Sequence, residues 1–205
     1  MIKVISFDIG GTLIKGVNNN YTMTEFSKIT GCDYNDIKCN YRDIFQKREG
    51  TFDDLVGLFC KKLNIHKTNE LRKFLWKNFN QESFFDNDVI PIIKKLKELG
   101  YKVILFSNNS SLYPDKIPDE VKNLCDGLFY SYLMGHTKDE SEAYKYIENK
   151  LGFQSNEILH IGDSYDNDYL YPIKNGWNAL FYGNKENTKC ISNLNEIFKY
   201  LEGEL

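Results

Sequence analysis

The chain has 205 residues, and its 26 Lys and Arg against 29 Asp and Glu leave a formal net charge of −3. A charge this close to zero favours neither a nucleic acid nor a membrane surface as a partner, so we expect a small molecule or another protein. With 41% hydrophobic residues, 4 Pro and 14 Gly, the composition excludes disordered, Pro-rich and collagen-like chains and suits one domain with a smaller inserted module.

The N-terminal residues enter an apolar strand pattern without a basic region or a small-residue cleavage site, so no signal peptide is expected. No window approaches the roughly 18 consecutive apolar residues that span a bilayer. These observations predict a cytoplasmic protein. Its cysteines are odd in number and form no Cys-x-x-Cys pair, which argues against a disulfide framework or a zinc site and predicts free thiols. They are Cys32, Cys39, Cys60, Cys125 and Cys190.

The first predicted element is a buried strand over residues 3–7, and the long segment that follows it, residues 16–85, is different in character. That segment lacks a β-branched run and carries helix signals, so we expect it to be all-helical. Two candidate helix starts have the spacing of a capping box or a weaker form of it: Thr22 with Glu25, and Thr51 with Asp54. Two apolar faces follow: Phe52, Leu55, Val56, Phe59 and Leu63, then Leu71, Phe74, Leu75 and Phe79.

After residue 85, short apolar runs alternate with helical periods, a pattern typical of a parallel sheet covered by helices. Buried strands are expected at 102–106, 128–130, 158–161 and 178–182. Two apolar stripes each stop at a glycine suited to a helix C-terminus. They are Val89, Ile92, Ile93, Leu96 and Leu99 before Gly100, and Ala143, Ile147 and Leu151 before Gly152.

These elements predict an α/β fold with a doubly wound, Rossmann-like parallel sheet. Residues 1–15 and 86–205 would form the core domain, and residues 16–85 would form an inserted helical cap domain. Ligands in such sheets bind beyond the carboxyl ends of the strands, which is where we expect the cap to lie. A purely structural insertion is the alternative.

The first predicted strand leads into Phe7-Asp8-Ile9-Gly10-Gly11-Thr12-Leu13, which places a carboxylate beside a loop with two glycines. Glycines let backbone N–H groups approach an anion, and an aspartate at a strand end can act as a nucleophile or a metal ligand. On this segment alone, a turn in which Asp8 only caps a following helix is an equal alternative.

Later segments favour phosphate chemistry. The run Ile161-Gly162-Asp163-Ser164-Tyr165-Asp166-Asn167-Asp168 again places carboxylates just past a parallel strand. Asp8 and Asp163 with a backbone carbonyl would form part of an oxygen shell for Mg²⁺. The donors of Ser107-Asn108-Asn109 could hold phosphoryl oxygens, and Lys138 could neutralise the transferring group.

In order and spacing, these segments resemble the four motifs of the haloacid dehalogenase-like superfamily, which consists mostly of Mg²⁺-dependent phosphohydrolases that use an aspartyl-phosphate intermediate. Asp8 to Leu13 matches the first motif except at Gly10. Ser107, Lys138 and the run from Gly162 to Asp168 match the other three. The family also places a helical cap between its first and second motifs, where residues 16–85 fall.

The resemblance implies a role for each matching residue, with Mg²⁺ as the cofactor and a small phosphorylated or phosphonylated compound as the substrate. Asp8 would attack phosphorus and bind Mg²⁺. The further metal ligands would be the Gly10 carbonyl and Asp163, with Asp168 supporting them from behind. Thr12 would order the loop, Gly11, Ser107 and Asn108 would bind phosphate oxygens, and Lys138 would pair with Asp8 and the phosphoryl group.

Gly10 is the one mismatch, because phosphatases of the family carry a second aspartate there as general acid and base. Loss of a general acid costs roughly 10²- to 10⁴-fold in rate. Three interpretations stay open. In the first, the leaving group needs little protonation, as in an acyl phosphate or a phosphonate. In the second, another side chain supplies the proton, such as Asp166, Tyr165, His136 or one from the cap. In the third, the chain binds Mg²⁺ and a phosphorylated ligand or protein partner with weak turnover or none.

Asp8 to Thr12 followed by Lys15 also resembles the first phosphate loop of actin-like sugar and pantothenate kinases, although 205 residues are short for the paired domains of those enzymes. Among the remaining residues, His160 is expected to be a core residue, and the acidic run 139–142 a solvated helix start. Aromatic residues near the end of the cap are expected to belong to its core or to line a pocket. They are Trp76, Phe79, Phe84 and Phe85.

Overall fold

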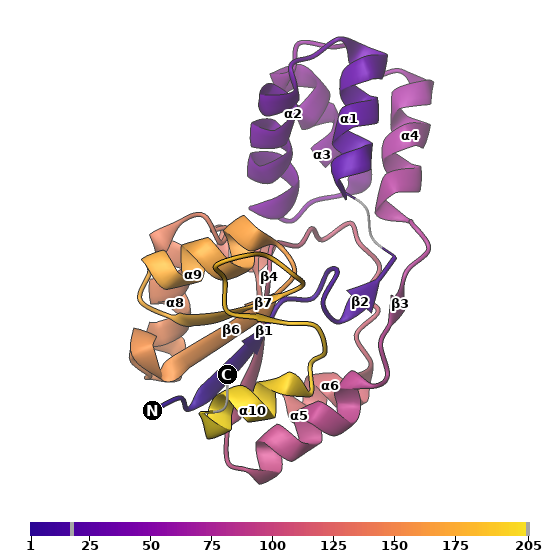
Figure 1. The fold of residues 1–205 in the computed structure, drawn as a ribbon. Helices are drawn as coiled ribbons and strands as arrows, with labels where there is room; N and C mark the ends of the chain where they lie inside the picture. The colour runs from indigo at the N-terminus through magenta and orange to yellow at the C-terminus, as the bar shows by residue number, and fades with distance from the viewer. Residues whose placement is uncertain (17–18, 204–205) are drawn as a thin grey trace.

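The computed structural model describes residues 1–16 and 19–203, and within them six parallel strands form one sheet (Figure 1). The strand order is β5-β4-β1-β6-β7-β8. The strands are β1 (Val4–Phe7), β4 (Lys102–Ser107), β5 (Gly127–Tyr130), β6 (Ile158–Gly162), β7 (Asn178–Tyr182) and β8 (Cys190–Ile191). The predicted α/β fold is therefore confirmed, with the short strand β8 as an addition. The prediction that the strand at 128–130 is buried is wrong, since this strand, β5, forms an edge of the sheet and is only partly buried.

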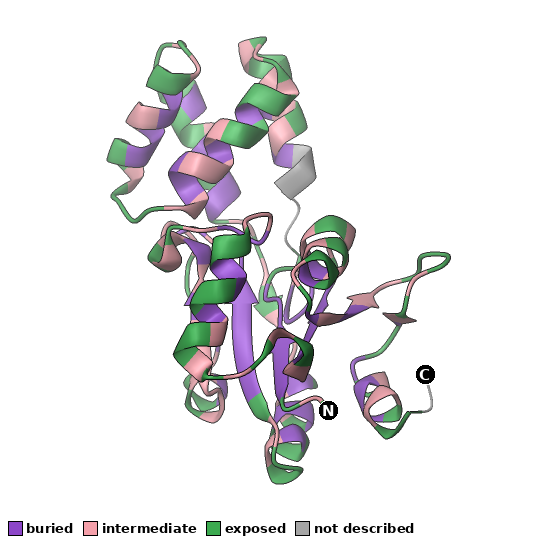
Figure 2. Cartoon of the chain, turned by 90° about the vertical axis from the view of Figure 1, so that its left-hand side faces the viewer, coloured by how far each residue is buried: buried purple, intermediate pink, exposed green. Residues whose placement is uncertain are grey.

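The sheet is buried on both faces, as the continuous apolar runs require. In β4, Val103 and Leu105 face one apolar cluster, and Ile104 and Phe106 face the other. Helices α5 (Val89–Glu98), α6 (Asp119–Leu124) and α10 (Glu196–Glu202) cover the first face, and α8 (Ser141–Leu151) covers the second. Figure 2 shows the resulting column of buried strands at the centre of the domain.

The two predicted apolar stripes correspond to α5 and α8. Gly100 and Gly152 both adopt the left-handed conformation, with φ of +87° and +74°, which suits a residue just past a helix end. The expectation that Leu99 belongs to the buried stripe is wrong. The residue is 58% exposed, because α5 ends at Glu98 and Leu99 falls outside the packed face.

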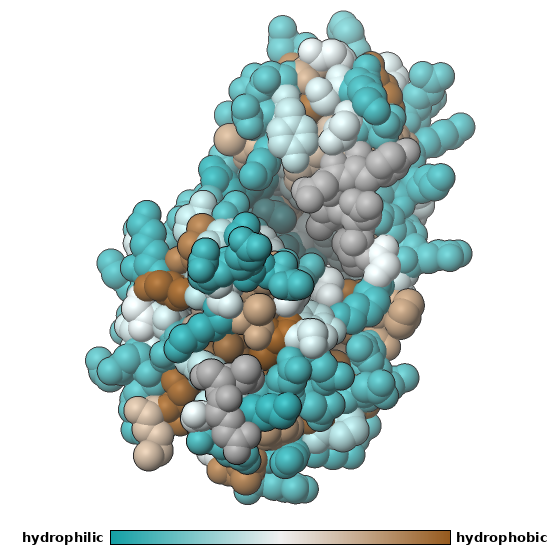
Figure 3. Space-filling view, in the orientation of Figure 1, coloured by the Kyte–Doolittle hydropathy of each residue, from teal (hydrophilic) through white to brown (hydrophobic). Residues whose placement is uncertain are grey.

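Helices α1 (Asn19–Thr30), α2 (Tyr34–Tyr41), α3 (Phe52–Lys62) and α4 (Asn69–Phe79), with the π-helical turn η1 (Arg42–Gln46), form a separate block above the sheet (Figure 1). The block has its own apolar cluster, built around packed rings such as Phe26, Phe45 and Phe59. Hydrophilic side chains cover most of the block on the face drawn in Figure 3. We refer to α1, α2, η1, α3 and α4 together as the helical block.

Two expectations for this segment are wrong and one is confirmed. Thr22 lies inside α1 and donates a hydrogen bond to Asn78, so Thr22 and Glu25 form no capping box. Thr51 does cap α3, accepting a hydrogen bond from the Asp54 N–H. The segment is also not entirely helical, because β3 (Phe84–Phe85) pairs antiparallel with β2 (Ile14–Lys15).

The β2–β3 pair is too short to leave a periodic signal in the sequence, and it depends on tertiary packing of Ile14 and Phe85 against the core. The remaining elements are short: α7 (Ser131–Met134), η2 (Ser155–Glu157), η3 (Tyr165–Leu170) and α9 (Tyr171–Lys174). Within residues 1–16 and 19–203, no helix has the length and apolar character needed to cross a membrane. The cysteines are free, as predicted, with Cys60 buried and Cys39 exposed.

Candidate active site

The carboxyl ends of three neighbouring strands bring together residues that are far apart in the sequence. Asp8 follows β1, Ser107 is the last residue of β4, and Asp163 follows β6. Phe7 pairs with Leu105 on one side and with Ile161 on the other. Because the strands are parallel and in this register, the residues that follow them meet at one edge of the sheet, the usual ligand position in such folds.

Three carboxylates gather at this edge. One oxygen each from Asp8, Asp163 and Asp168 lie within 4.8 Å of one another. Asp8 and Asp168 are buried, and Asp163 is exposed at the opening. An all-oxygen set of carboxylates with one side open to water suits a hard divalent cation such as Mg²⁺, which keeps several water ligands. These residues therefore fit the ion that the sequence predicts.

Lys138 lies beside the acidic cluster as a buried cation. Its Nζ is 2.5 Å from Oδ1 of Asp8 and 2.6 Å from Oδ1 of Asp168. The Lys138 backbone is fixed as well, because its N–H donates to Asn108 Oδ1 at 2.9 Å and its carbonyl accepts from the Tyr144 hydroxyl at 2.8 Å. Loss of either carboxylate would leave this buried charge partly unpaired.

The pKa values show how strongly these charges depend on one another. Burial raises the pKa of Asp8 to about 7, and the negative charges of Asp168 and Asp163 add to that rise while Lys138 opposes it. Burial also favours a higher pKa for Asp168, but Lys138 and His160 outweigh it and hold that pKa below its ordinary value. Crowding of negative charge at Asp8 is what a bound divalent cation would relieve.

The glycine loop after Asp8 is folded back on itself. The N–H groups of Leu13 and Ile14 donate to the Ile9 carbonyl at 2.9 and 2.8 Å, and the Gly11 N–H donates to the Ile14 carbonyl at 2.7 Å. The buried Thr12 hydroxyl lies 3.5 Å from Asp163 Oδ1, so it links the loop to the acidic cluster.

Lys15, which carried the resemblance to kinases, donates to the Gly11 carbonyl at 2.9 Å. The ammonium group is therefore bound to an oxygen of its own loop. Its ring contact is with Tyr182, 4.4 Å from the ammonium to the ring centroid, on β7.

His160 is buried, as predicted, but its link to the site was not anticipated. Its Nδ1 is 2.8 Å from the Ser6 hydroxyl, and its Nε2 is 3.1 Å from Oδ1 of Asp168. Burial and the charge of Lys138 together lower the pKa of His160 to about 4 against the opposing effect of Asp168, so the ring is neutral at pH 7. The signal for this role was a histidine inside an apolar strand shortly before an acidic loop.

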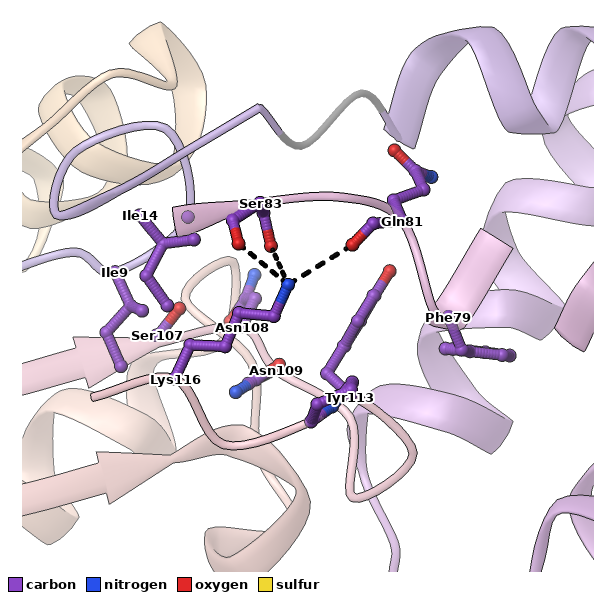
Figure 4. A pocket seen from close by; sticks show the side chains of 12 residues that line it. Ile9, Ile14, Phe79, Gln81, Ser83, Ser107, Asn108, Asn109, Tyr113 and Lys116 are labelled. Atoms are coloured by element: carbon purple, nitrogen blue, oxygen red, sulfur yellow. Dashed lines mark hydrogen bonds between the residues drawn. The ribbon is translucent and has the colours of Figure 1, made fainter. Parts of the chain in front are cut away.

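A cavity of about 600 Å³, including its mouth, lies between this edge of the sheet and the helical block (Figure 4). The residues that line it are Ile9, Gly10, Ile14, Phe79, Gln81, Ser83, Ser107, Asn108, Asn109, Tyr113, Pro114 and Lys116. Among the predicted residues it therefore includes Gly10, Ser107 and Asn108. The other predicted site residues do not belong to this lining; they are Asp8, Gly11, Thr12, Lys138, Asp163 and Asp168. The same is true of three alternative proton donors, His136, Tyr165 and Asp166.

The aromatic residues at the end of the block have different positions. Phe79 lines the cavity and packs in the cluster of the block. Phe85 packs against the core of the sheet, whereas Trp76 and Phe84 are exposed and do not line the cavity.

The acidic run after Lys138 is not simply a solvated helix start. Asp139 pairs with Arg42 at 2.6 Å, and Glu140 pairs with Lys47. Both cations lie in or directly after η1, so these ion pairs connect the helical block to the loop that carries Lys138. The expectation of a purely solvated run missed these contacts because they join residues that are distant in the sequence.

Comparisons with known proteins agree with this geometry. A family model described as a haloacid dehalogenase-like hydrolase matches residues 2–170. The D-ribitol-5-phosphate phosphatase of Bacteroides thetaiotaomicron is 26% identical over 188 residues, which cover 83% of this chain and 87% of that protein. The enolase-phosphatase E1 of Xenopus tropicalis is 28% identical over 124 residues, which cover 54% of this chain and 47% of that protein.

Solved structures show the same fold. A HAD-like family hydrolase from Porphyromonas gingivalis superimposes with a TM-score of 0.66 at 19% identity, covering 91% of this chain and 94% of the other. A HAD family enzyme from Bacteroides thetaiotaomicron, in complex with magnesium and inorganic phosphate, gives a TM-score of 0.61 at 19% identity, covering 91% and 98%.

Proposed function

The chain belongs to the haloacid dehalogenase-like hydrolases, and we propose that it is a Mg²⁺-dependent phosphohydrolase that forms a phosphoryl intermediate on Asp8. The observation that carries this proposal is the position of Asp8. Its carboxylate is held by Lys138 at 2.5 Å, belongs to an acidic cluster suited to a cation, and directly precedes Ile9 and Gly10, which line the cavity.

The proposed reaction has two displacements at phosphorus. In the first, an Asp8 oxygen attacks the phosphoryl group in line with the leaving oxygen, whose bond to phosphorus breaks. In the second, water attacks the phosphorus of the aspartyl phosphate and releases the Asp8 carboxylate. Mg²⁺, held by Asp8, Asp163 and the Gly10 carbonyl with Asp168 behind them, would offset the negative charge of the phosphoryl oxygens.

The surrounding residues orient these groups. Lys138 would neutralise the phosphoryl group while it keeps the Asp8 carboxylate in place. Asp168 accepts a hydrogen bond from Lys138, and His160 in turn hydrogen-bonds to Asp168. We assign the phosphoryl oxygens to Ser107 and Asn108, which line the cavity at the end of β4. Gly11, the third predicted residue, has its N–H engaged by the Ile14 carbonyl, so it would bind phosphate only if that hydrogen bond is given up.

We further propose that the helical block acts as a cap over the site. It supplies Phe79 to the cavity wall and is tied to the Lys138 loop by the pairs Arg42–Asp139 and Lys47–Glu140. A cap that excludes water strengthens the electrostatic contacts inside a site and limits side reactions.

A small substrate suits the cavity, because polar side chains stand among the apolar residues that line it. Its lining includes the amide-bearing residues Asn108 and Asn109 and the hydroxyl-bearing residues Ser83 and Tyr113. The Gln81 amide is turned away and donates to Asn78 Oδ1 at 2.6 Å. Amide and hydroxyl groups can hydrogen-bond a polyhydroxylated body, so polyol and sugar phosphates are the first class to test, in keeping with the similarity to D-ribitol-5-phosphate phosphatase. Acyl phosphates and phosphonates form the second class, because they need less protonation of the leaving group.

Gly10 favours one alternative function, the binding of Mg²⁺ and a phosphorylated ligand or a protein partner with little or no turnover. The match of the family model to residues 2–170 covers the loop that resembles kinases and favours a hydrolase over a kinase.

The deciding experiment measures phosphate release from acetyl phosphate, p-nitrophenyl phosphate and ribitol 5-phosphate with Mg²⁺ and with excess chelator. Turnover that needs Mg²⁺, with a phosphoenzyme that borohydride reduces at Asp8, supports the proposal. Tight Mg²⁺ and phosphate binding without release from any of the three substrates would instead support the binding function.

A further inference from the structure

Gly10 leaves the leaving-group side of the site without an acid. It lies on the cavity wall, and a Cβ placed on it would meet no atom within 4 Å. An aliphatic leaving group departs as a strongly basic alkoxide unless it receives a proton, so an ester phosphatase with this loop needs another donor.

The cavity itself limits the choice. Among its lining residues, only Lys116 and Tyr113 carry an ionisable proton, since the others are apolar residues, glycine, proline, and side chains with neutral hydroxyl or amide groups. The Tyr113 hydroxyl lies 2.9 Å from the Tyr41 hydroxyl. Burial raises the pKa of Tyr113, which makes its phenol a weaker acid.

Lys116 has surroundings that suit a donor. Its Nζ donates to the Ser83 carbonyl and the Ser83 hydroxyl at 2.8 Å each, and to the Gln81 carbonyl at 3.3 Å. Figure 4 shows the ammonium pointing toward Ser83 and Gln81 in the cavity. The contact with Gln81 is the longest, so the N–H that makes it is the one a bound leaving-group oxygen would take most easily.

The charge of Lys116 also lacks compensation. In the part of the chain that the structure describes, no carboxylate lies within ion-pair distance of Lys116, whereas Lys138 has two. Of the two lysines near the site, Lys116 is therefore the one whose ammonium is held by neutral oxygens, whereas two carboxylates hold Lys138.

We propose that Lys116 supplies the proton for the leaving group that the aspartate of related phosphatases would supply at position 10. This inference rests on the proposed function. As the bond from phosphorus to the leaving oxygen breaks, that oxygen takes a proton from Lys116, which becomes a neutral amine. When water then attacks the aspartyl phosphate, the amine takes a proton from the water and the ammonium is restored.

The test compares two substrates that differ in their need for a proton. We expect Lys116→Met to lower kcat/KM for glycerol 3-phosphate, relative to kcat/KM for p-nitrophenyl phosphate, by roughly 10²- to 10⁴-fold, because nitrophenolate leaves without protonation. Gly10→Asp in the Lys116→Met background should restore most of the lost activity on glycerol 3-phosphate. Lys94→Met, which removes a half-exposed lysine on α5 paired with Glu120, is the matched control and should leave the ratio unchanged.

A second variant separates proton donation from charge. Arginine keeps the positive charge and N–H donors but does not give up a proton in proteins. Lys116→Arg should therefore lower kcat/KM for glycerol 3-phosphate, relative to kcat/KM for p-nitrophenyl phosphate, as much as Lys116→Met does. Retention of the ratio by Lys116→Arg would overturn the proposal and indicate that the cation binds a group of the substrate. An equal fall in kcat/KM for both substrates in Lys116→Met would overturn it too, and would indicate that Lys116 only positions residues 81–83 through its hydrogen bonds.

The proposed function can fail separately. If the wild-type chain releases no phosphate from these two substrates, from ribitol 5-phosphate or from acetyl phosphate with Mg²⁺, both proposals are wrong. If it releases phosphate from acetyl phosphate alone, the phosphohydrolase stands and the role of Lys116 is wrong. If it hydrolyses both substrates and Lys116→Met leaves their ratio unchanged, the phosphohydrolase stands and the role of Lys116 is wrong. Thermal unfolding of each variant separates loss of the fold from loss of chemistry.

Discussion

Gly11 and Asp163 lie so close together that a Cβ added to Gly11 would stand 2.1 Å from Oδ2 of Asp163. Gly11 also has a φ of +82°, in the left-handed region that side chains other than glycine rarely adopt. The loop after β1 and the loop after β6 are therefore in direct steric contact at the acidic cluster, and only a residue without a side chain fits while Asp163 keeps its position.

Gly11→Ala should displace the Asp163 carboxylate and weaken Mg²⁺ binding. The strained backbone should also lower the free energy of unfolding by about 1 to 2 kcal/mol. We expect the Mg²⁺ concentration for half-maximal activity to rise at least tenfold, measured by titrating phosphate release with Mg²⁺. An unchanged Mg²⁺ requirement would mean that Asp163 moves without consequence for the metal.

Gly10→Asp should be accepted by the same loop. A Cβ at Gly10 has no neighbour within 4 Å, and the residue is exposed on the cavity wall. If the missing acid limits the reaction, this variant raises kcat/KM for alkyl phosphate esters by up to roughly 10²-fold, with a smaller effect on acetyl phosphate. No gain at saturating Mg²⁺ would show that protonation of the leaving group does not limit the wild-type chain, which is the result expected where Lys116 already supplies the proton. Gly11→Ala serves as the neighbouring variant that the loop does not accept.

Asp8→Asn should abolish turnover and leave the fold intact. The amide keeps the shape of the side chain but is not a nucleophile, and Lys138 retains its partner Asp168 at 2.6 Å. We expect the rate of phosphate release to fall by more than about 10³-fold, with the midpoint of thermal unfolding changed by only a few degrees. Residual activity near the wild-type rate would remove the assigned role of Asp8.

Asp163→Ala should weaken the metal site without removing the nucleophile. The exposed Asp163 contributes little to the core, so stability should change by no more than about 0.5 kcal/mol. The dissociation constant for Mg²⁺, measured by calorimetry, should rise at least tenfold, and added Mg²⁺ should restore part of the activity. An unchanged dissociation constant would exclude Asp163 as a ligand.

The sheet could be predicted from the sequence because its strands are continuous apolar runs that leave a strong local signal. Asp8 and Asp163 could be placed at one edge for the same reason, since parallel strands bring their carboxyl ends together. The β2–β3 pair and Leu99 show the limit of local patterns, because a two-residue strand and the last turn of a helix depend on packing that the pattern does not contain.

The contacts around Lys138 could be predicted only in part. Its pairing with Asp8 follows from the resemblance. The Ser6–His160–Asp168 chain of hydrogen bonds instead joins two register partners on β1 and β6 to a residue of η3, a register that the sequence alone does not specify. The same holds for Lys116, which lies in a loop without periodicity, and whose acceptors at 81–83 come from the other side of the cavity. Such contacts depend on tertiary structure and produce no regular spacing of residues in the sequence.

Asp126 provides a pH-dependent contribution to stability that is remote from the site. Burial favours a higher pKa for its carboxyl, but hydrogen bonds from Lys97, from Lys102 and from the Val103 N–H outweigh it, so its pKa is below 3.8. A carboxyl with a lowered pKa in the folded state stabilises the protein above its unfolded pKa, and that contribution is lost as the pH falls through the folded pKa.

Asp126→Asn should therefore lower the free energy of unfolding by about 1 kcal/mol at neutral pH, because it removes the charge but keeps an acceptor for the Val103 N–H. The difference from the wild-type chain should shrink as the pH falls below 3.8, where the wild-type carboxyl is increasingly protonated. Urea unfolding at several pH values measures both effects. Asp119→Asn is the matched control, since that side chain is 92% exposed and its pair with Lys122 should contribute almost nothing. A difference for Asp126→Asn that stays constant from neutral to acid pH would show that the carboxyl acts through its shape and not through its charge.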